Sequence, residues 1–176
     1  MVDRQPVQRL DVDAFDAALD ELAGILHACA LEGASIGFVT PFSFEQARAY
    51  WAGLRESVGR AERVVLAVRG PDGEVVATVQ VVPALMPNGA HRAEISKLLV
   101  HPRARRAGHG RRLMTDAEQH ATALGRTLLV LDTATDGAER LDLDLGYRRA
   151  GQVPGYARSV DGTTLDATTI MFKQLG

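Results

Sequence analysis

The stretch that decides the fold reads LLVHPRARRAGHG and occupies residues 98–110. Its apolar start is typical of a strand, and the glycines near its end mark the entry to a long helix. Gly108 and Gly110 permit positive φ angles and let the backbone approach a ligand closely. Because the amides at a helix start are unpaired and the helix dipole favours negative charge there, a pyrophosphate fits this junction. Arg105 and Arg106 would add charge-assisted hydrogen bonds.

The spacing alone leaves an alternative open, in which these residues form an ordinary helix entry with a solvated basic face. Two other phosphate-binding patterns do not fit. No Lys-Ser or Lys-Thr pair follows the glycines, as a Walker loop requires, and the junction does not follow the first strand of a dinucleotide-binding unit.

Composition narrows the classes of protein that this chain can represent. Its 176 residues suffice for one domain with a substantial core, and 46% apolar and 24% charged residues are ordinary for a globular protein. A net charge of −2 gives no field that would attract nucleic acid, whereas five arginines within residues 103–112 favour a small anionic ligand. The single cysteine, Cys29, excludes an internal disulfide, and the scattered histidines predict no metal site.

No apolar run reaches eighteen residues, and the N-terminus lacks the apolar core of a secretion signal, so we expect a cytoplasmic protein without a membrane partner. Periodicity and turn signals predict one mixed α/β domain in the order β-α-α-β-β-β-α-β-α-β-β. Strands are expected at 7–12, 63–68, 75–82, 93–100, 127–131, 147–151 and 167–172, and helices at about 14–33, 43–54, 108–124 and 138–143. The apolar run at 127–131 predicts a central buried strand.

The motif Arg105-x-x-Gly108-x-Gly110, placed after Leu-Leu-Val-His-Pro, resembles the acetyl-CoA loop of the GNAT superfamily of N-acetyltransferases. Five further segments resemble, more narrowly, the tabtoxin resistance protein group within it. They lie at residues 32–38, 87–89, 92–98, 131–133 and 153–156.

The resemblance implies a single GNAT domain over residues 1–176, with about four helices and with fourth and fifth strands that splay apart. Acetyl-CoA would be the co-substrate, without a metal. Its pantetheine arm would pair with the backbone of Leu98, Leu99 and Val100, where an N–H could polarise the thioester carbonyl. The segment Arg105-Arg106-Ala107-Gly108-His109-Gly110, with Arg111 beginning the helix, would hold the pyrophosphate.

Two carboxylates are candidates for removing the proton from an ammonium acceptor. Glu94 lies on the fourth strand, eleven residues before Arg105, as the glutamate base of the superfamily's histone acetyltransferases does. Asp132 lies at the exit of the fifth strand. The structural alternatives are that Glu94 pairs with Arg92 or Lys97, and that Asp132 caps or turns the chain before the next helix.

Ser35, Phe38 and Tyr156 are candidates for contacting the acceptor substrate. The fourth helix departs from the family pattern, because Asp142 stands where a tyrosine is expected to protonate the leaving thiolate. A carboxyl group is ionised at pH 7 and donates no proton unless it is strongly desolvated.

The sequence therefore predicts acetyl transfer to a small primary amine, with a β-lactam or amino-acid-like acceptor and a role in antibiotic or toxin resistance if the narrower resemblance extends to chemistry. Dimers are common in this group, and the final strand is a candidate for pairing with a second subunit. Two alternatives remain open: a CoA-binding module that has lost catalysis, and a regulatory domain that binds an anion or nucleotide.

Overall fold

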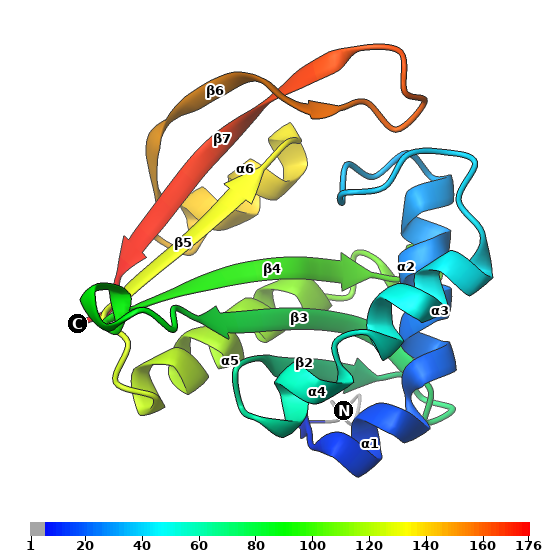
Figure 1. Ribbon diagram of the computed structural model, residues 1–176, viewed down its shortest axis with the longest axis horizontal. Coiled ribbons are helices and arrows are strands. Elements are labelled where there is room, and N and C mark those ends of the chain that lie inside the picture. Colours follow the sequence, from blue (N-terminus) through cyan, green and yellow to red (C-terminus); the bar gives the residue numbers. More distant parts are fainter. Residues whose placement is uncertain (1–5) are drawn as a thin grey trace.

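The computed structural model describes residues 6–176, which form one seven-stranded mixed sheet with the strand order β1-β2-β3-β4-β5-β7-β6 (Figure 1). The strands are β1 Gln8–Leu10, β2 Val64–Arg69, β3 Val75–Pro83, β4 Arg92–Val100, β5 Leu128–Thr133, β6 Arg148–Arg158 and β7 Leu165–Gln174. The helices are α1 Val12–Ala17, α2 Leu19–Leu31, α3 Phe44–Ala52, α4 Arg55–Gly59, α5 His109–Ala123 and α6 Asp136–Asp144, with 3₁₀ turns at Pro87–Gly89 and Pro102–Ala104.

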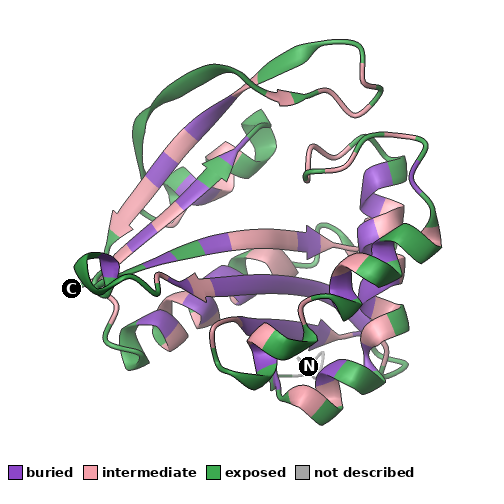
Figure 2. Cartoon of the chain, in the orientation of Figure 1, coloured by how far each residue is buried: buried purple, intermediate pink, exposed green. Residues whose placement is uncertain are grey.

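Two apolar clusters lie on opposite faces of the sheet. On one face, α1 to α4 bury Phe15 and Trp51 against residues of β2 to β4 such as Val65. On the other face, α5 buries Leu113 against residues of the same strands, including Leu66. Strands β2 and β3 are therefore covered on both faces, as their purple colour in Figure 2 shows.

The predicted element order is confirmed, with local differences at the helix ends and in β6, which runs to Arg158 and not only to residue 151. The first helix begins at Val12 because the Asp11 side chain caps it and accepts from the Ala14 amide. It is divided at Ala18 into α1 and α2, and the second helical region is likewise divided into α3 and α4. The predicted capping box is present, since Ser43 and Gln46 exchange side-chain to backbone hydrogen bonds.

The fifth strand is internal to the sheet as predicted, but the expectation that both its faces are buried is wrong. Leu129 and Leu131 pack into the α5 cluster, whereas Asp132 on the opposite face is exposed. The cause is the extent of the helical layer, since α1 to α4 lie over β1 to β4 and leave that face of β5 and β7 open (Figure 1).

Strands β4 and β5 splay apart, which confirms the predicted feature of the GNAT fold. They pair in parallel at three positions only, from Arg92↔Leu128 to Glu94↔Val130, and then diverge (Figure 1). At the wide end, the turn between β6 and β7 reaches the loop after α2, where the Thr40 amide donates to the Val160 carbonyl at 2.7 Å. Within residues 6–176, every helix is too short or too polar to span a bilayer.

Candidate active site

A β-bulge in β4 sets which side chains face the splayed region. The β3–β4 register shifts between Thr78 and Gln80, and Lys97 adopts a positive φ of 50°. Ile95 and Leu98 both pack into the α5 cluster although they are three positions apart. The extra residue therefore keeps Glu94 and Lys97 together on the opposite face, which strict alternation would not do.

The backbone at the end of β4 is open toward β5. The His101 amide donates to the Val76 carbonyl of β3 at 2.8 Å, while the Val100 carbonyl faces away from β3 and accepts from the Cys29 thiol at 3.5 Å. No strand of the described chain pairs with this edge of β4 beyond Glu94. The side chain of Leu99 is buried, so what residues 98–100 offer a ligand along this edge is chiefly main-chain groups.

The loop after β4 leads into α5 through two left-handed residues, Arg106 with φ 65° and Gly108 with φ 80°. Gly108 occupies the N-cap and has no side chain, and the helical ladder begins with the Arg112 amide bonded to the Gly108 carbonyl. The amides at the start of α5 therefore donate to no N-cap side chain, which is the condition under which a helix start binds an anion.

Gly110 serves a different purpose from Gly108. It lies within the first turn of α5, and a Cβ there would lie 3.4 Å from Leu141 Cδ2 and 4.0 Å from Val100 Cγ2. These are ordinary van der Waals distances, so an alanine side chain would fit between α6 and β4. The expectation of positive φ at both glycines thus holds for Gly108 alone, because Gly110 has helical backbone angles.

Two arginines of the predicted pyrophosphate site form surface ion pairs. Arg105 Nη1 lies 2.7 Å from Glu32 Oε2 at the end of α2, and Arg111 Nη2 lies 3.2 Å from Asp144 Oδ2 of α6. All four side chains are about half exposed, and pairs of this kind contribute little to stability. The pairs could therefore give way to a stronger anion. Arg106 and Ala107 are exposed beside them.

Glu94 and Asp132 lie on the same face of the sheet, on the two strands that splay apart. Glu94 is exposed and forms no ion pair with any residue in the described part of the chain, so the alternative in which it pairs with Arg92 or Lys97 is wrong. Asp132 Oδ2 accepts from Thr168 Oγ1 at 3.2 Å, and Thr135 caps α6 instead. Both carboxylates are thus exposed to solvent on this face of the sheet.

Three residues beside these carboxylates were not predicted as site residues from the sequence: Lys97, Tyr50 and Gln80. Lys97 Nζ lies 5.8 Å from the centroid of the Tyr50 ring, and the Tyr50 hydroxyl accepts from Gln80 Nε2 at 3.4 Å. Burial lowers the pKa of Lys97, against the opposing effect of Asp132 and Glu94. Burial also raises the pKa of Tyr50. The feature that could have identified Lys97 is the β-bulge, and predicting that bulge requires the β3–β4 register to be known.

The three predicted acceptor contacts have different surroundings. Phe38 stacks on Phe42 with ring centroids 4.4 Å apart and meets Tyr50 edge-on at 5.3 Å, next to Lys97. Ser35 lines a hollow of about 620 Å³ between the end of α2, the β5–α6 loop and the β6–β7 turn. Tyr156, on an irregular part of β6, is 53% exposed, and no ring contact joins it to another described residue.

Asp142 on α6 is only 4% exposed. Burial, with a smaller effect from Glu139, raises the pKa of Asp142 to about 7. The carboxyl is therefore the strongly desolvated exception, and it keeps a proton at pH values where an ordinary aspartate is ionised. Tyr147 is a core residue that is buried in the α5 cluster, and burial raises the pKa of its phenol.

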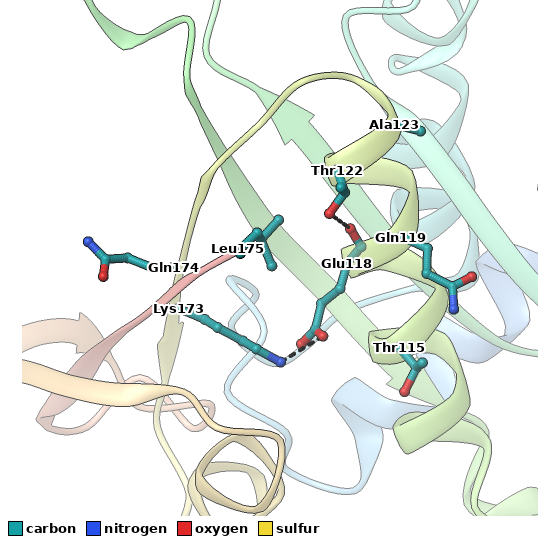
Figure 3. Close-up of a pocket in the computed structure, with 9 residues that line it drawn as sticks. Thr115, Glu118, Gln119, Thr122, Ala123, Lys173, Gln174 and Leu175 are labelled. Atoms are coloured by element: carbon teal, nitrogen blue, oxygen red, sulfur yellow. Dashed lines mark hydrogen bonds and ion pairs between the residues drawn. The ribbon is translucent and has the colours of Figure 1, made fainter.

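A second hollow of about 600 Å³ lies between α5 and the end of β7 (Figure 3). Lys173 Nζ contacts Glu118 Oε2 and the Leu145 carbonyl there, each at 2.7 Å. None of the predicted site residues lines this hollow. Its ion pair instead ties β7 to α5.

Comparison with known proteins agrees with this geometry. The model of the acetyltransferase (GNAT) family matches residues 34–143, a range that includes both carboxylates and the whole loop before α5.

Solved structures share the fold over almost the whole chain. A GNAT superfamily phosphinothricin acetyltransferase from Sinorhizobium meliloti, in complex with acetyl-CoA, has a TM-score of 0.79 and 21% identity, covering 97% of this chain and 88% of its own. A ribosomal-protein-alanine N-acetyltransferase from Brucella melitensis has a TM-score of 0.76 and 22% identity, covering 96% and 99%. An aminoglycoside 6′-acetyltransferase type Ii has a TM-score of 0.69 and 22% identity, covering 96% of both chains. Their acceptors differ, so the fold does not identify the acceptor.

Proposed function

Since this chain belongs to the acetyltransferase (GNAT) family, we propose that it transfers the acetyl group of acetyl-CoA directly to the primary amine of a small molecule. The observation that carries the proposal is the divergence of β4 and β5 after Glu94, followed by the start of α5, which has no side-chain cap. A thioester carrier with an extended arm and a pyrophosphate matches both features.

Acetyl-CoA would lie along the open edge of β4. The main-chain groups of Leu98, Leu99 and Val100 would pair with the pantetheine arm, as they would with an added strand. The pyrophosphate would be held by the loop from Arg105 to Gly110 and by Arg111. Binding would exchange the surface ion pairs of Arg105 and Arg111 for charge-assisted hydrogen bonds to phosphate oxygens.

Glu94 would act as the base, with Asp132 assisting or positioning the amine. An ammonium must lose a proton before its nitrogen can attack, and both carboxylates face the splayed region, where they can take that proton directly or through water. The amine nitrogen then bonds to the thioester carbon, the C–S bond breaks, and the electron pair leaves with the sulfur. A main-chain N–H of β4 would stabilise the oxyanion formed on the way.

The leaving thiolate needs no strong acid, because a thiol has a pKa of about 8.5. Asp142 stands where the family pattern has a tyrosine. Since burial raises its pKa to about 7, its carboxyl carries less negative charge near neutral pH than an ordinary aspartate and would repel a nearby thiolate less. This supports an active enzyme over the alternative of a catalytically silent acyl-CoA-binding module.

The acceptor that we propose is a small amine of amino-acid-like or β-lactam type, and the setting is the cytoplasm. The likeness to a phosphinothricin acetyltransferase supports this acceptor class and a role in antibiotic or toxin resistance. The narrower relation to the tabtoxin resistance group, a homodimer, and contacts of Ser35, Phe38 and Tyr156 with the acceptor belong to the same proposal.

The test combines two measurements on the purified chain. Titration calorimetry should show binding of CoA and acetyl-CoA, and thiol release should be seen with members of a panel of small amines. Glu94→Gln should lower kcat by about 10²-fold or more, as expected for a lost general base, while the exposed Glu56→Gln on α4 serves as the matched control. Equal turnover by wild type and Glu94→Gln would refute the assigned base, and CoA binding without turnover of any amine would favour the silent module.

A further inference from the structure

Lys97 is an enclosed cation on the acceptor side of the sheet that no mechanistic step above uses. It lies at the β4 bulge and is only partly exposed, and it forms neither a hydrogen bond nor an ion pair with any residue between 6 and 176. An ammonium that is partly withdrawn from water without a direct ion pair is costly. A ligand anion at this position would offset that cost.

The surroundings of the ammonium come from two separate parts of the chain, α3 and the loop between α2 and α3. Tyr50 of α3 presents its ring 5.8 Å from Nζ, and Phe38 stands edge-on to Tyr50. Gly37 has a φ of 94°, and a Cβ on it would lie 3.7 Å from Nζ. The loop therefore passes close to Lys97 with its smallest residue.

Charges of both signs lie on this face. Glu94 and Asp132 lie on the strands that splay apart and act on Lys97 electrostatically, yet neither forms an ion pair with it. Arg63 adds a second cation, which hydrogen-bonds the Gln80 side chain beside Tyr50. A molecule that carries both an amine and an anionic group would match this pattern, with its amine at the carboxylates and its anion at the cation.

Resting on the proposed transferase function, we infer that Lys97 is a specificity-determining residue that binds the carboxylate of the acceptor, so that the preferred acceptors are amino acids or close analogues. The Tyr50 ring would line the space next to the carboxylate. Arg63 would contribute long-range attraction only, since its guanidinium is already engaged by Gln80.

The test compares α- and ω-amino acids with their matched carboxamides, which keep the amine and remove the negative charge. Wild type should acetylate at least one acid with a kcat/KM about 10- to 100-fold above that of its amide, the ratio expected for one hydrogen bond to a charged group. Lys97→Met keeps the length of the side chain and removes the charge. It should abolish that preference, mainly by raising KM for the acid, and leave the amide within about 3-fold. Lys97→Arg should restore part of the preference, and thermal melting would verify that each variant is folded.

Three results would overturn the inference. The first is wild type that acetylates neutral amides as well as acids. The second is a Lys97→Met variant that loses the same factor of kcat with both, which would place the ammonium at the reacting thioester. The third is a chain that acetylates no amino acid. In each case, thiol release with amines that lack a carboxylate, together with acetyl-CoA binding in calorimetry, would show that the proposed transferase function is correct although the role of Lys97 is not.

Discussion

Replacing Asp142 with Asn should make the folded protein more stable at neutral and alkaline pH. The carboxyl is 4% exposed, and burial raises its pKa from 3.8 to about 7. Between these two values the folded state keeps a proton that the unfolded state releases. The free energy of unfolding therefore falls as pH rises from about 4 to 7, and the loss is complete above that range. An amide carries no charge at any of these pH values and escapes the loss.

The size of the effect follows from the same two values. A difference of one pKa unit corresponds to about 1.36 kcal/mol, which sets an upper limit of about 4 kcal/mol for Asp142. Water reaching the carboxyl in local fluctuations reduces this limit, and we expect roughly 2 kcal/mol in practice. Asp144 lies two residues further along α6 with a side chain that is 54% exposed, so Asp144→Asn should change stability by less than about 0.5 kcal/mol.

Urea unfolding of the three proteins at pH 5, 6, 7 and 8 measures this directly. The difference between Asp142→Asn and wild type should grow with pH and then level off above pH 7, while the Asp144→Asn curve should follow wild type. Parallel pH profiles for Asp142→Asn and wild type would refute the reasoning, because they would show that the carboxyl titrates with an ordinary pKa.

Three further perturbations test other parts of the structure. Gly108→Ala places a Cβ on a residue with a φ of 80° and no other atom within 4 Å, so it should cost about 1–2 kcal/mol of stability and weaken acetyl-CoA binding in calorimetry. Gly110→Ala should be folded and at most mildly destabilised. Equal stability losses would contradict the different roles of the two glycines. Glu32→Gln releases Arg105 from its ion pair and should tighten CoA binding by about 2- to 5-fold at low salt, while Arg105→Ala should weaken CoA binding. Weaker CoA binding by Glu32→Gln would contradict the proposal that Arg105 exchanges Glu32 for a phosphate. Lys173→Met leaves the largely buried Glu118 unpaired and should lower the free energy of unfolding in urea by about 3 kcal/mol. The double variant with Lys173→Met and Glu118→Gln should recover most of that loss.

Most of the fold could be predicted from the sequence because the signals for it are local. The glycine-rich entry to α5, the capping box at Ser43 and the turn between β2 and β3 each depend on a few adjacent residues. The apolar run before Asp132 predicted a strand correctly but could not show that one of its faces lies open, since that depends on how far α1 to α4 extend over the sheet.

The site was predicted less completely because its remaining features depend on contacts between distant segments. The orientation of Lys97 follows from a register shift against β3, and alternation along β4 alone would place it on the wrong face. The partner of Arg105 lies 73 residues away at Glu32. Asp142 is buried because of how α6 packs, so the sequence could predict a raised pKa only on the condition that the carboxyl is desolvated.

Hydrogen exchange of the backbone amides, with and without acetyl-CoA, tests the central claim most directly, since it locates the carrier on the chain. The structure predicts that acetyl-CoA slows exchange along the open edge of β4 at residues 95–100 and at the start of α5 at residues 108–112, and leaves the β2–β3 turn at residues 70–73 unchanged. Binding that protects neither segment, or that protects only the hollow between α5 and β7, would contradict the account.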